Sequence, residues 1–232
     1  MDTAPADGLI AASWLLIALP LAGAAVLLLG GRRTDRWGHL LGVGTVVAAF
    51  VIGLLCTLQL DGRRLDVDLY TFVSTGSLNV QAGLLFDPLS AVFVLLITGV
   101  GALIHIYSVG YMAHDPRRRL FFAYLNLFIA AMLLLVLGDN YVALYVGWEG
   151  VGLASYLLIA FWYERPSAAT AAKKAFIMNR VGDVGLALAI FLMFAQLGTV
   201  TYAGVFGAVG TLAGGTVTAL GLLLLLGACG KS

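Results

Sequence analysis

Long apolar stretches recur along nearly the whole chain, separated by shorter polar segments. A helix needs about 20 consecutive apolar residues to cross a hydrocarbon core of about 30 Å, and each stretch is close to that length. The pattern therefore predicts an all-α fold, a polytopic membrane helix bundle. We expect seven spans, at about residues 9–30, 40–60, 88–111, 120–138, 141–161, 175–196 and 215–231.

Composition supports lipid as the solvent. Hydrophobic residues make up 61% of the 232 residues and charged residues 11%, whereas a soluble domain is about 25% charged. Only Asp2 and Asp7 carry charge before the first apolar stretch, so we expect a first membrane helix and not a cleaved signal. The formal net charge of +1 provides no basic face. We expect the lipid bilayer, and no nucleic acid, as a partner.

Basic residues are distributed unevenly among the connections between the predicted spans. The first, third and fifth connections hold nine basic residues and the second holds two. The positive-inside rule places the first, third and fifth connections in the cytoplasm or its equivalent, and the N-terminus outside. The basic residues are Arg32, Arg33 and Arg36, then Arg63 and Arg64, then Arg117, Arg118 and Arg119, then Arg165, Lys173 and Lys174.

The one long connection, from Asp61 to Asp87, alternates apolar and polar residues at 65–69 and 78–80, with residues 74–77 (Ser-Thr-Gly-Ser) between them. Alternation around such a turn predicts a hairpin outside the bilayer, and an irregular loop is the alternative. The segment 198–214 is rich in glycine and weakly apolar. It is expected either to lie on the membrane surface or to be re-entrant.

Glu149 stands eight residues into the fifth predicted span, about 12 Å from its start. A carboxylate at that depth costs at least a few kcal/mol unless it is protonated, paired or wetted. Two interpretations remain open. Glu149 is either a structural group, ion-paired or neutral and hydrogen-bonded, or a proton-carrying group.

The sixth predicted span carries a polar stripe made of Asn179, Arg180 and Asp183. Arg180 and Asp183 are three residues apart, the spacing at which helical side chains meet, so we expect them to pair within their helix. Structural pairing and a functional role both remain open. Lys173 and Lys174 fall at the start of the span, where a snorkelling side chain is the default interpretation.

Three further groups are ambiguous or uninformative. Lys231, near Gly227 and Gly230, is either an interfacial lysine or a buried cation in a broken helix, and the two glycines favour a break. His105 in the third span is either a hydrogen-bonded packing residue or an accessory relay member. Cys56 and Cys229 are expected to be buried thiols. Since no ligand-spaced cluster of Cys or His occurs, we expect no metal and no bound cofactor in this chain.

Several motifs together resemble the antiporter-like subunit L family of the proton-pumping NADH:quinone oxidoreductase, respiratory complex I. The resemblance covers residues 84–232, and the first 80 residues fit two leading helices and an outward hairpin. The motifs are residues 86–90 (Phe-Asp-Pro-Leu-Ser), 147–159 (Gly-Trp-Glu-Gly-Val-Gly-Leu-Ala-Ser-Tyr-Leu-Leu-Ile), 173–176 (Lys-Lys-Ala-Phe), 179–183 (Asn-Arg-Val-Gly-Asp) and 227–232 (Gly-Ala-Cys-Gly-Lys-Ser).

The resemblance implies roles for the intramembrane charges. In this family a Glu on the fifth helix pairs with a Lys on a broken seventh helix, and opening and closing of the pair moves protons; Glu149 and Lys231 match these positions. The family's Asp on the sixth helix modulates the pair, and Asp183 matches it. Arg180 and Lys174 fit as further polar members of the path.

The resemblance also implies an organisation and a function. We expect one membrane domain over residues 1–232, with leading helices and an outward loop in 1–83 and the start of the proton-translocating bundle in 84–232. The chain would translocate protons beside other membrane subunits, especially an adjacent antiporter-like subunit, in a bacterial plasma membrane. NADH, FMN, iron–sulfur clusters and quinone would bind partner subunits. The alternatives are the large subunit of a multisubunit cation/proton antiporter and a purely structural scaffold.

Overall fold

The computed structural model describes residues 4–76 and 78–231. Ser77, in the predicted turn, and Ser232, at the end of the last motif, lie outside the described residues. Seven of the described helices are long and apolar enough to cross a membrane, which confirms the predicted number of spans. Together with the hairpin they are α1 (Trp14–Leu29), α2 (Gly38–Gln59), β2 (Leu65–Thr75), β3 (Leu78–Phe86), α3 (Pro88–Tyr111), α4 (Arg118–Leu137), α5 (Tyr141–Ile159), α6 (Pro166–Leu197) and α8 (Gly214–Lys231).

Most helix ends fall within a few residues of the prediction, but α6 begins at Pro166 and not near residue 175. Hydropathy failed here because residues 167–174 include Ser, Thr and Lys. The helix still forms because proline is favourable in the first turn and the following alanines have high helix propensity. The helix ends at Gly198, which adopts a left-handed conformation (φ 69°) that glycine tolerates without strain.

The long connection forms the predicted hairpin, β2 with β3, so the irregular-loop alternative is wrong. A two-residue strand, β1 (Ala4–Pro5), adds to β2 in parallel, with Ala4 opposite Leu65. Nothing in the alternation predicted this third strand. Pro5 fits because an edge strand need not donate every backbone hydrogen bond.

The glycine-rich segment contains a short helix, α7 (Tyr202–Ala208), and the 3-10 turn η3 (Val209–Thr211). Thr201 caps α7, because its hydroxyl accepts a hydrogen bond from the amide of Gly204 at 3.1 Å. Burial, with Tyr141 and Asp139 adding to it, raises the pKa of the Tyr202 phenol. Whether the segment lies on the membrane surface or re-enters it stays open.

The chain forms two compact units: one holds α1–α4 and the base of the hairpin, the other holds the hairpin tip and α5–α8. The expectation of a single membrane domain stays a prediction. In the first unit α1 packs against α2 and α4, and α2 against α3. The buried core of this unit includes Leu16, Val46, Val94, Leu133 and Cys56, so the expectation for Cys56 is confirmed.

The start of α3 explains the Phe-Asp-Pro-Leu-Ser motif. The Asp87 carboxylate accepts the amide of Ser90 at 2.8 Å, and the Asp87 amide donates to the Ser90 hydroxyl at 2.8 Å. This reciprocal capping box, with Pro88 in the first turn, satisfies amide groups that a helix otherwise leaves unpaired. The motif therefore fixes where the third span begins.

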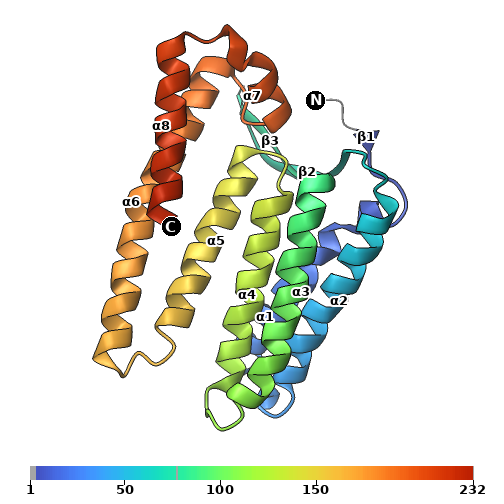
Figure 1. The fold of residues 1–232 in the computed structure, drawn as a ribbon, viewed down its shortest axis with the longest axis vertical. Helices are drawn as coiled ribbons and strands as arrows, with labels where there is room; N and C mark the ends of the chain where they lie inside the picture. The colour runs from blue at the N-terminus through green and yellow to red at the C-terminus, as the bar shows by residue number, and fades with distance from the viewer. Residues whose placement is uncertain (1–3, 77, 232) are drawn as a thin grey trace. The chain divides into compact units, whose positions relative to one another are not determined.

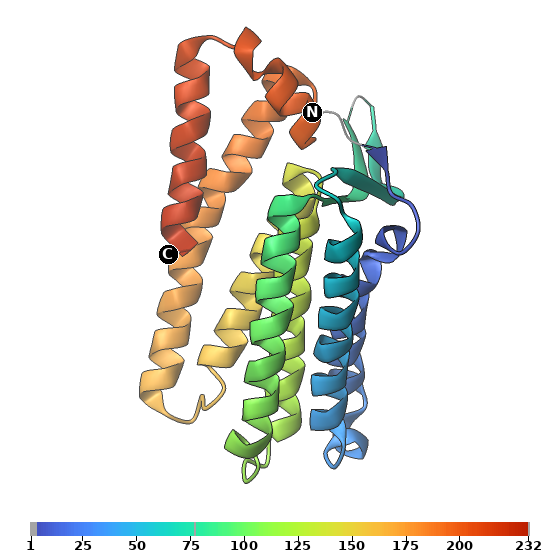
Figure 2. The ribbon, with the colours of Figure 1, turned by 45° about the vertical axis from the view of Figure 1, so that its right-hand side comes forward.

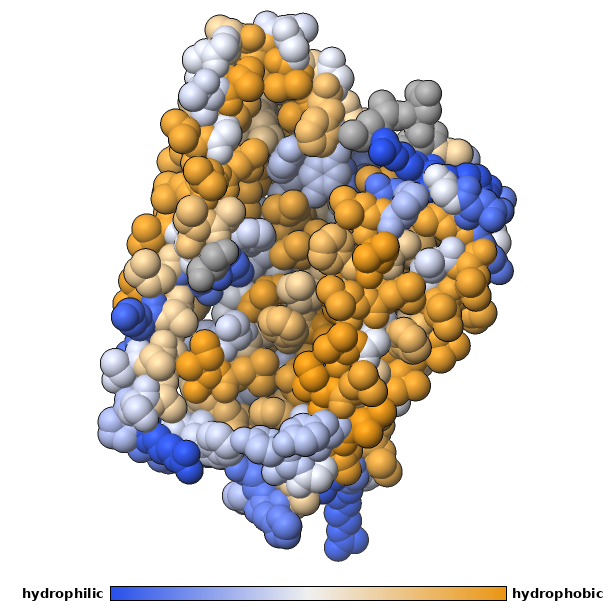
Figure 3. All heavy atoms as spheres, in the orientation of Figure 1, coloured by the Kyte–Doolittle hydropathy of each residue, from blue (hydrophilic) through white to orange (hydrophobic). Residues whose placement is uncertain are grey.

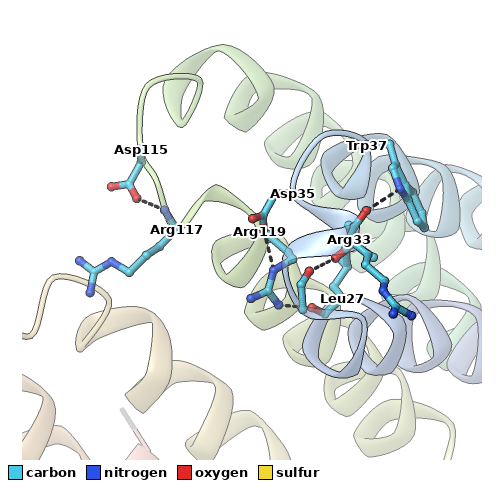
Figure 4. A network of polar contacts seen from close by, with 9 residues as sticks. Leu27, Arg33, Asp35, Trp37, Asp115, Arg117 and Arg119 are labelled. Carbon is cyan, nitrogen blue, oxygen red and sulfur yellow. Dashed lines mark hydrogen bonds and ion pairs between the residues drawn. The ribbon is translucent and has the colours of Figure 1, made fainter.

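At the end of the α1–α4 unit that lies away from the start of α3, polar contacts join the connections between helices (Figure 4). Arg119 of α4 donates to Asp35 at 2.9 Å and to the backbone carbonyl of Leu27, which ties the α1–α2 connection to α4. The Trp37 indole N–H donates to the carbonyl of Arg33 at 3.1 Å. The first and third connections thus lie at the same end of this unit, as alternating spans require. Hydrophobic side chains dominate the outer face seen in Figure 3, with hydrophilic ones gathered at the loop ends.

In the second unit α6 and α8 run side by side, and both views show it (Figures 1 and 2). Their backbones meet where two glycines face each other: a Cβ atom built on Gly230 would lie 2.5 Å from the Cα of Gly182. Small residues at such crossings are typical of membrane helix pairs.

Asn140 caps the start of α5. Its side-chain oxygen accepts a hydrogen bond from the amide of Ala143 at 2.8 Å, and its side-chain nitrogen donates to the carbonyl of Gln81 in the hairpin at 2.9 Å.

Two expectations about α8 are wrong. The helix is not broken at Gly227 or Gly230 but continues to Lys231, because these glycines serve the close packing against α6. Cys229 is exposed and not buried. It lies on the face of α8 that does not pack within this chain, which sequence reasoning could not identify.

Candidate functional site

Three helices of the second unit bring four ionisable side chains into one cluster: Glu149 from α5, Arg180 and Asp183 from α6, and Lys231 from α8. Each of these helices qualifies as a membrane span. We call these four residues the charged cluster. Ionisable groups within spans are costly, so their convergence makes this cluster the candidate functional site.

Arg180 contacts both carboxylates of the cluster. Its guanidinium forms an ion pair with Glu149, whose side chain is 22% exposed. Its Nε lies 3.6 Å from a carboxylate oxygen of Asp183, whose side chain is 3% exposed, so the predicted pair within α6 is confirmed. The guanidinium also lies over the ring of Phe176, 4.8 Å from its centroid. A single cation therefore links the carboxylates of two helices.

Lys231 has a different partner from the one expected. Its Nζ donates a hydrogen bond to the backbone carbonyl of Trp148 at 2.7 Å and lies 5.3 Å from the centroid of that indole ring. Within the described residues the ion pair of Glu149 is with Arg180, so the implied pair of Glu149 with Lys231 is not the one formed here. Lys231 nevertheless reaches α5 one residue before Glu149.

Sequence analysis placed Trp148 and Gly152 within the motif of residues 147–159 but predicted no contact of either residue with Lys231. A Cβ atom at Gly152 would lie 2.9 Å from Lys231 Nζ, 3.4 Å from Arg180 Nη2 and 3.7 Å from Asn179 Nδ2. Asn179 thus belongs to the surroundings of the cluster, as its place on the polar stripe suggested. The signal that could have revealed Gly152 was its position three residues after Glu149, on the same face of α5.

Several buried polar atoms of the cluster have no hydrogen-bond partner in the described part of the chain. They are Glu149 Oε1, Arg180 Nε, both carboxylate oxygens of Asp183, and Trp148 Nε1. Buried polar atoms are satisfied in the great majority of native structures. The protein groups of the described residues therefore leave the hydrogen-bonding capacity of these carboxylates partly unused.

The remaining predicted residues lie elsewhere. Lys174 is exposed, six residues before Arg180 in α6, and forms no ion pair among residues 4–76 and 78–231. His105 belongs to the other unit and is buried, 1% exposed. Its Nδ1 is 2.7 Å from the carbonyl of Gly101 and its Nε2 is 3.2 Å from Asn126 Nδ2. This geometry favours the packing interpretation of His105.

The described residues hold no group of three or more His, Cys, Asp and Glu side chains that could bind a metal ion. Carboxylate, guanidinium and ammonium groups in contact can exchange partners without any covalent step.

Family models match two parts of the chain. The model described as NADH-ubiquinone oxidoreductase (complex I), chain 5 N-terminus, matches residues 72–122. The model described as NADH:quinone oxidoreductase/Mrp antiporter, TM, matches residues 138–232 and so contains all four residues of the charged cluster.

Curated relatives cover nearly the whole chain. NADH-quinone oxidoreductase subunit L of Mycobacterium tuberculosis is 63% identical over 95% of this chain, which spans 36% of that protein. Subunit L of Escherichia coli is 43% identical over 81% of this chain, which spans 31% of that protein. The chain thus spans about a third of the length of the relatives it matches.

Solved structures show the same fold. A chain in the structure of an Mrp complex from Dietzia sp. aligns with a TM-score of 0.81 and 24% identity over 95% of this chain and 24% of that chain. A chain of the membrane-bound sulfane sulfur reductase, an archaeal respiratory membrane complex, gives 0.81 with 19% identity. At these identities the likeness concerns the fold alone.

Proposed function

Because the chain belongs to the antiporter-like family shared by NADH:quinone oxidoreductases and Mrp antiporters, we propose that it moves protons as part of a subunit L of the former. It is an integral membrane protein. In this proposal partner subunits bind NADH, FMN, iron–sulfur clusters and quinone and carry out the electron transfer, while this chain carries no redox group.

The single observation that carries the proposal is the charged cluster within three spans. Arg180 contacts Glu149 and Asp183 together, and Lys231 of α8 donates a hydrogen bond to the Trp148 carbonyl of α5, one helical turn before Gly152. At an effective dielectric of about 20, two unit charges 4 Å apart interact by about 4 kcal/mol. A change of partner by Arg180 or Lys231 is therefore enough to decide whether a nearby carboxyl group holds a proton.

The geometry supports a sequence of steps. With Arg180 on Glu149, the Glu149 carboxylate is balanced and stays ionised. When the guanidinium shifts fully to Asp183, which it already approaches within its own helix, Glu149 loses its countercharge and takes up a proton. When Arg180 returns, or when Lys231 moves from the Trp148 carbonyl to Glu149, the Glu149 carboxyl releases its proton to the next acceptor. Electron transfer in partner subunits would drive this exchange through the adjacent membrane subunit.

The remaining finer assignments are part of the same proposal. The positive-inside rule places the basic first, third and fifth connections in the bacterial cytoplasm and the hairpin on the other side of the plasma membrane. The adjacent antiporter-like subunit is the expected neighbour. The names of the relatives, subunits of NADH-quinone oxidoreductases, support these assignments.

Glu149→Gln in the full-length subunit tests the proposal. In inverted membrane vesicles we expect the assembled complex to persist and NADH-driven proton uptake to fall several-fold, because glutamine keeps the size of the side chain but carries no titratable proton. The matched control is Asp68→Asn, an equal charge change on an exposed hairpin residue, which should leave uptake unchanged. Normal proton uptake by assembled Glu149→Gln complex would refute the proposed role.

The second candidate is the large subunit of a multisubunit cation/proton antiporter. The family model that matches residues 138–232, whose description includes the Mrp antiporter, favours it. The discriminating measurement is Na⁺ or K⁺ exchange for protons in vesicles that oxidise no NADH. Exchange that depends on Glu149 under these conditions would establish the antiporter and displace the main proposal.

A further inference from the structure

The surroundings of the Lys231 ammonium group are shaped by a residue that has no side chain. The ammonium lies on the α5 backbone, bound to the carbonyl of Trp148, and the space it enters is the face of Gly152. Arg180 Nη2 and Asn179 Nδ2 border the same space, at 3.4 Å and 3.7 Å from the position of a Cβ atom on Gly152. Three nitrogen-bearing groups from two helices therefore converge on one glycine.

The crossing of α6 and α8 delivers Lys231 to this place. A Cβ atom on Gly182 would lie 2.6 Å from the Cα of Gly230, and one on Gly230 would lie 2.9 Å from the amide nitrogen of Gly182. In both cases the atom met is a backbone atom, which cannot move aside by rotation of a side chain. The backbone of α8 is thus fixed against α6 one residue before Lys231, and only the lysine side chain is free to adjust.

Gly152 differs from Gly182 and Gly230 in what a methyl group would meet. The nearest atom, at 2.9 Å, is the terminal nitrogen of a long flexible side chain. An alanine here would displace that nitrogen by bond rotations and would not separate the helices. The packing of the unit would persist while the ammonium moved away from Trp148 and from its place beside Arg180.

We propose that Gly152 is a positioning residue, whose missing side chain seats the Lys231 ammonium against α5 beside Arg180. The inference rests on the proposed function and adds to it a residue that determines the position of the Lys231 ammonium group between proton transfers. Arg180 borders this seat and is itself paired with the carboxylates of Glu149 and Asp183. Moving the ammonium changes the field at both carboxylates, and displacement of about 1 Å at a reacting group is known to have large effects on rate.

Gly152→Ala in the full-length subunit tests the inference. We expect normal amounts of assembled complex and proton uptake lowered by at least about twofold per complex. The matched control is Gly221→Ala in α8 of the same unit, where a Cβ atom would meet nothing within 4 Å, and it should behave as the parent. Loss of assembled complex in Gly152→Ala, or normal uptake by it, would overturn the inference.

A double-mutant cycle separates positioning from packing. If Gly152 acts through Lys231, adding Gly152→Ala to Lys231→Met should reduce uptake no further than Lys231→Met alone. Lys231→Gln provides a second background that keeps a polar side chain. A further additive loss in both backgrounds would show that Gly152 acts through something other than Lys231. Normal uptake by both Lys231 variants would instead refute the proposed role of Lys231 in proton transfer.

Discussion

Each unit holds a group of polar side chains among its spans, and the two groups are built on opposite principles. In the α1–α4 unit the group is a network of Thr45, His105 and Asn126, all neutral. In the α5–α8 unit it is the charged cluster of Glu149, Arg180, Asp183 and Lys231. Both groups lie in helices long enough to span a membrane, so both carry the energetic cost of placing polar side chains within the hydrocarbon core.

The neutral network satisfies its members. Asn126 Oδ1 accepts the Thr45 hydroxyl at 2.6 Å, and Asn126 Nδ2 lies within 3.2 Å of His105 Nε2 and of the carbonyls of Gly42 and Phe122. The second nitrogen of His105 reaches the carbonyl of Gly101. With a proton on Nδ1, the imidazole donates to Gly101 and accepts from Asn126. Such a network locks side chains in place and leaves nothing to exchange.

The charged cluster does not satisfy all its members. Its four ionisable groups have fewer hydrogen-bond and ion-pair partners in the described residues than their polar atoms could bind. Arg180 is divided between two carboxylates, Lys231 is bound to a neutral carbonyl, and Asp183 is almost fully buried with no hydrogen-bond partner in the described residues. Alternative pairings of the same groups are therefore available within the cluster. The comparison teaches that a buried polar group tied to the backbone serves packing, whereas one with competing partners can change state.

Breaking the shared cation should have the largest effect. Arg180→Gln removes the charge that balances both carboxylates, so we expect proton uptake by the assembled complex to be nearly abolished. Arg180→Lys keeps the charge but lacks the planar fork that reaches two carboxylates, and it should retain partial uptake. Uptake measured per assembled complex in inverted vesicles checks both, and equal activity of the two variants would contradict the bridging role.

Breaking the neutral network should affect stability and not transport. Asn126→Leu has a similar volume but leaves the Thr45 hydroxyl and the His105 ring without their partner, which should cost about 1–3 kcal/mol. We expect a lower melting temperature of the complex, with proton uptake per remaining complex unchanged. A loss of uptake without a loss of stability would show that the neutral network also takes part in transport.

The smallest effect is expected at Lys174. The resemblance places it on the proton path, but its side chain is exposed in α6 and has no ion pair within the described residues. If it acts only as a snorkelling residue, Lys174→Gln changes neither stability nor uptake beyond about 0.5 kcal/mol or its equivalent in rate. A several-fold loss of uptake would return Lys174 to the path and show that a neighbouring subunit completes its surroundings.

Properties local to the sequence were predictable. Hydropathy located the seven spans, alternation located the hairpin, and a spacing of three residues located the pair of Arg180 with Asp183. Motifs identified the family. Each of these depends on the chain over one or two helical turns, or on a pattern carried intact by relatives.

Properties that depend on how helices cross were not predictable. Gly227 and Gly230 indicated a break in α8, but they serve the close approach to Gly182. The partner of Lys231 is a backbone carbonyl, and backbone carbonyls are alike along every helix, so no pattern could single out Trp148. Gly152 stood within the motif of residues 147–159, but no pattern in the sequence indicated that three side chains converge on it.

The central claim is that the charged cluster, and not the neutral network, carries protons. It is tested most directly by measuring NADH-driven proton uptake per assembled complex for Glu149→Gln and Asn126→Leu in vesicles prepared in parallel. We predict a several-fold loss for Glu149→Gln and parental uptake for Asn126→Leu. Parental uptake for Glu149→Gln, or a loss of uptake for Asn126→Leu, would contradict the claim.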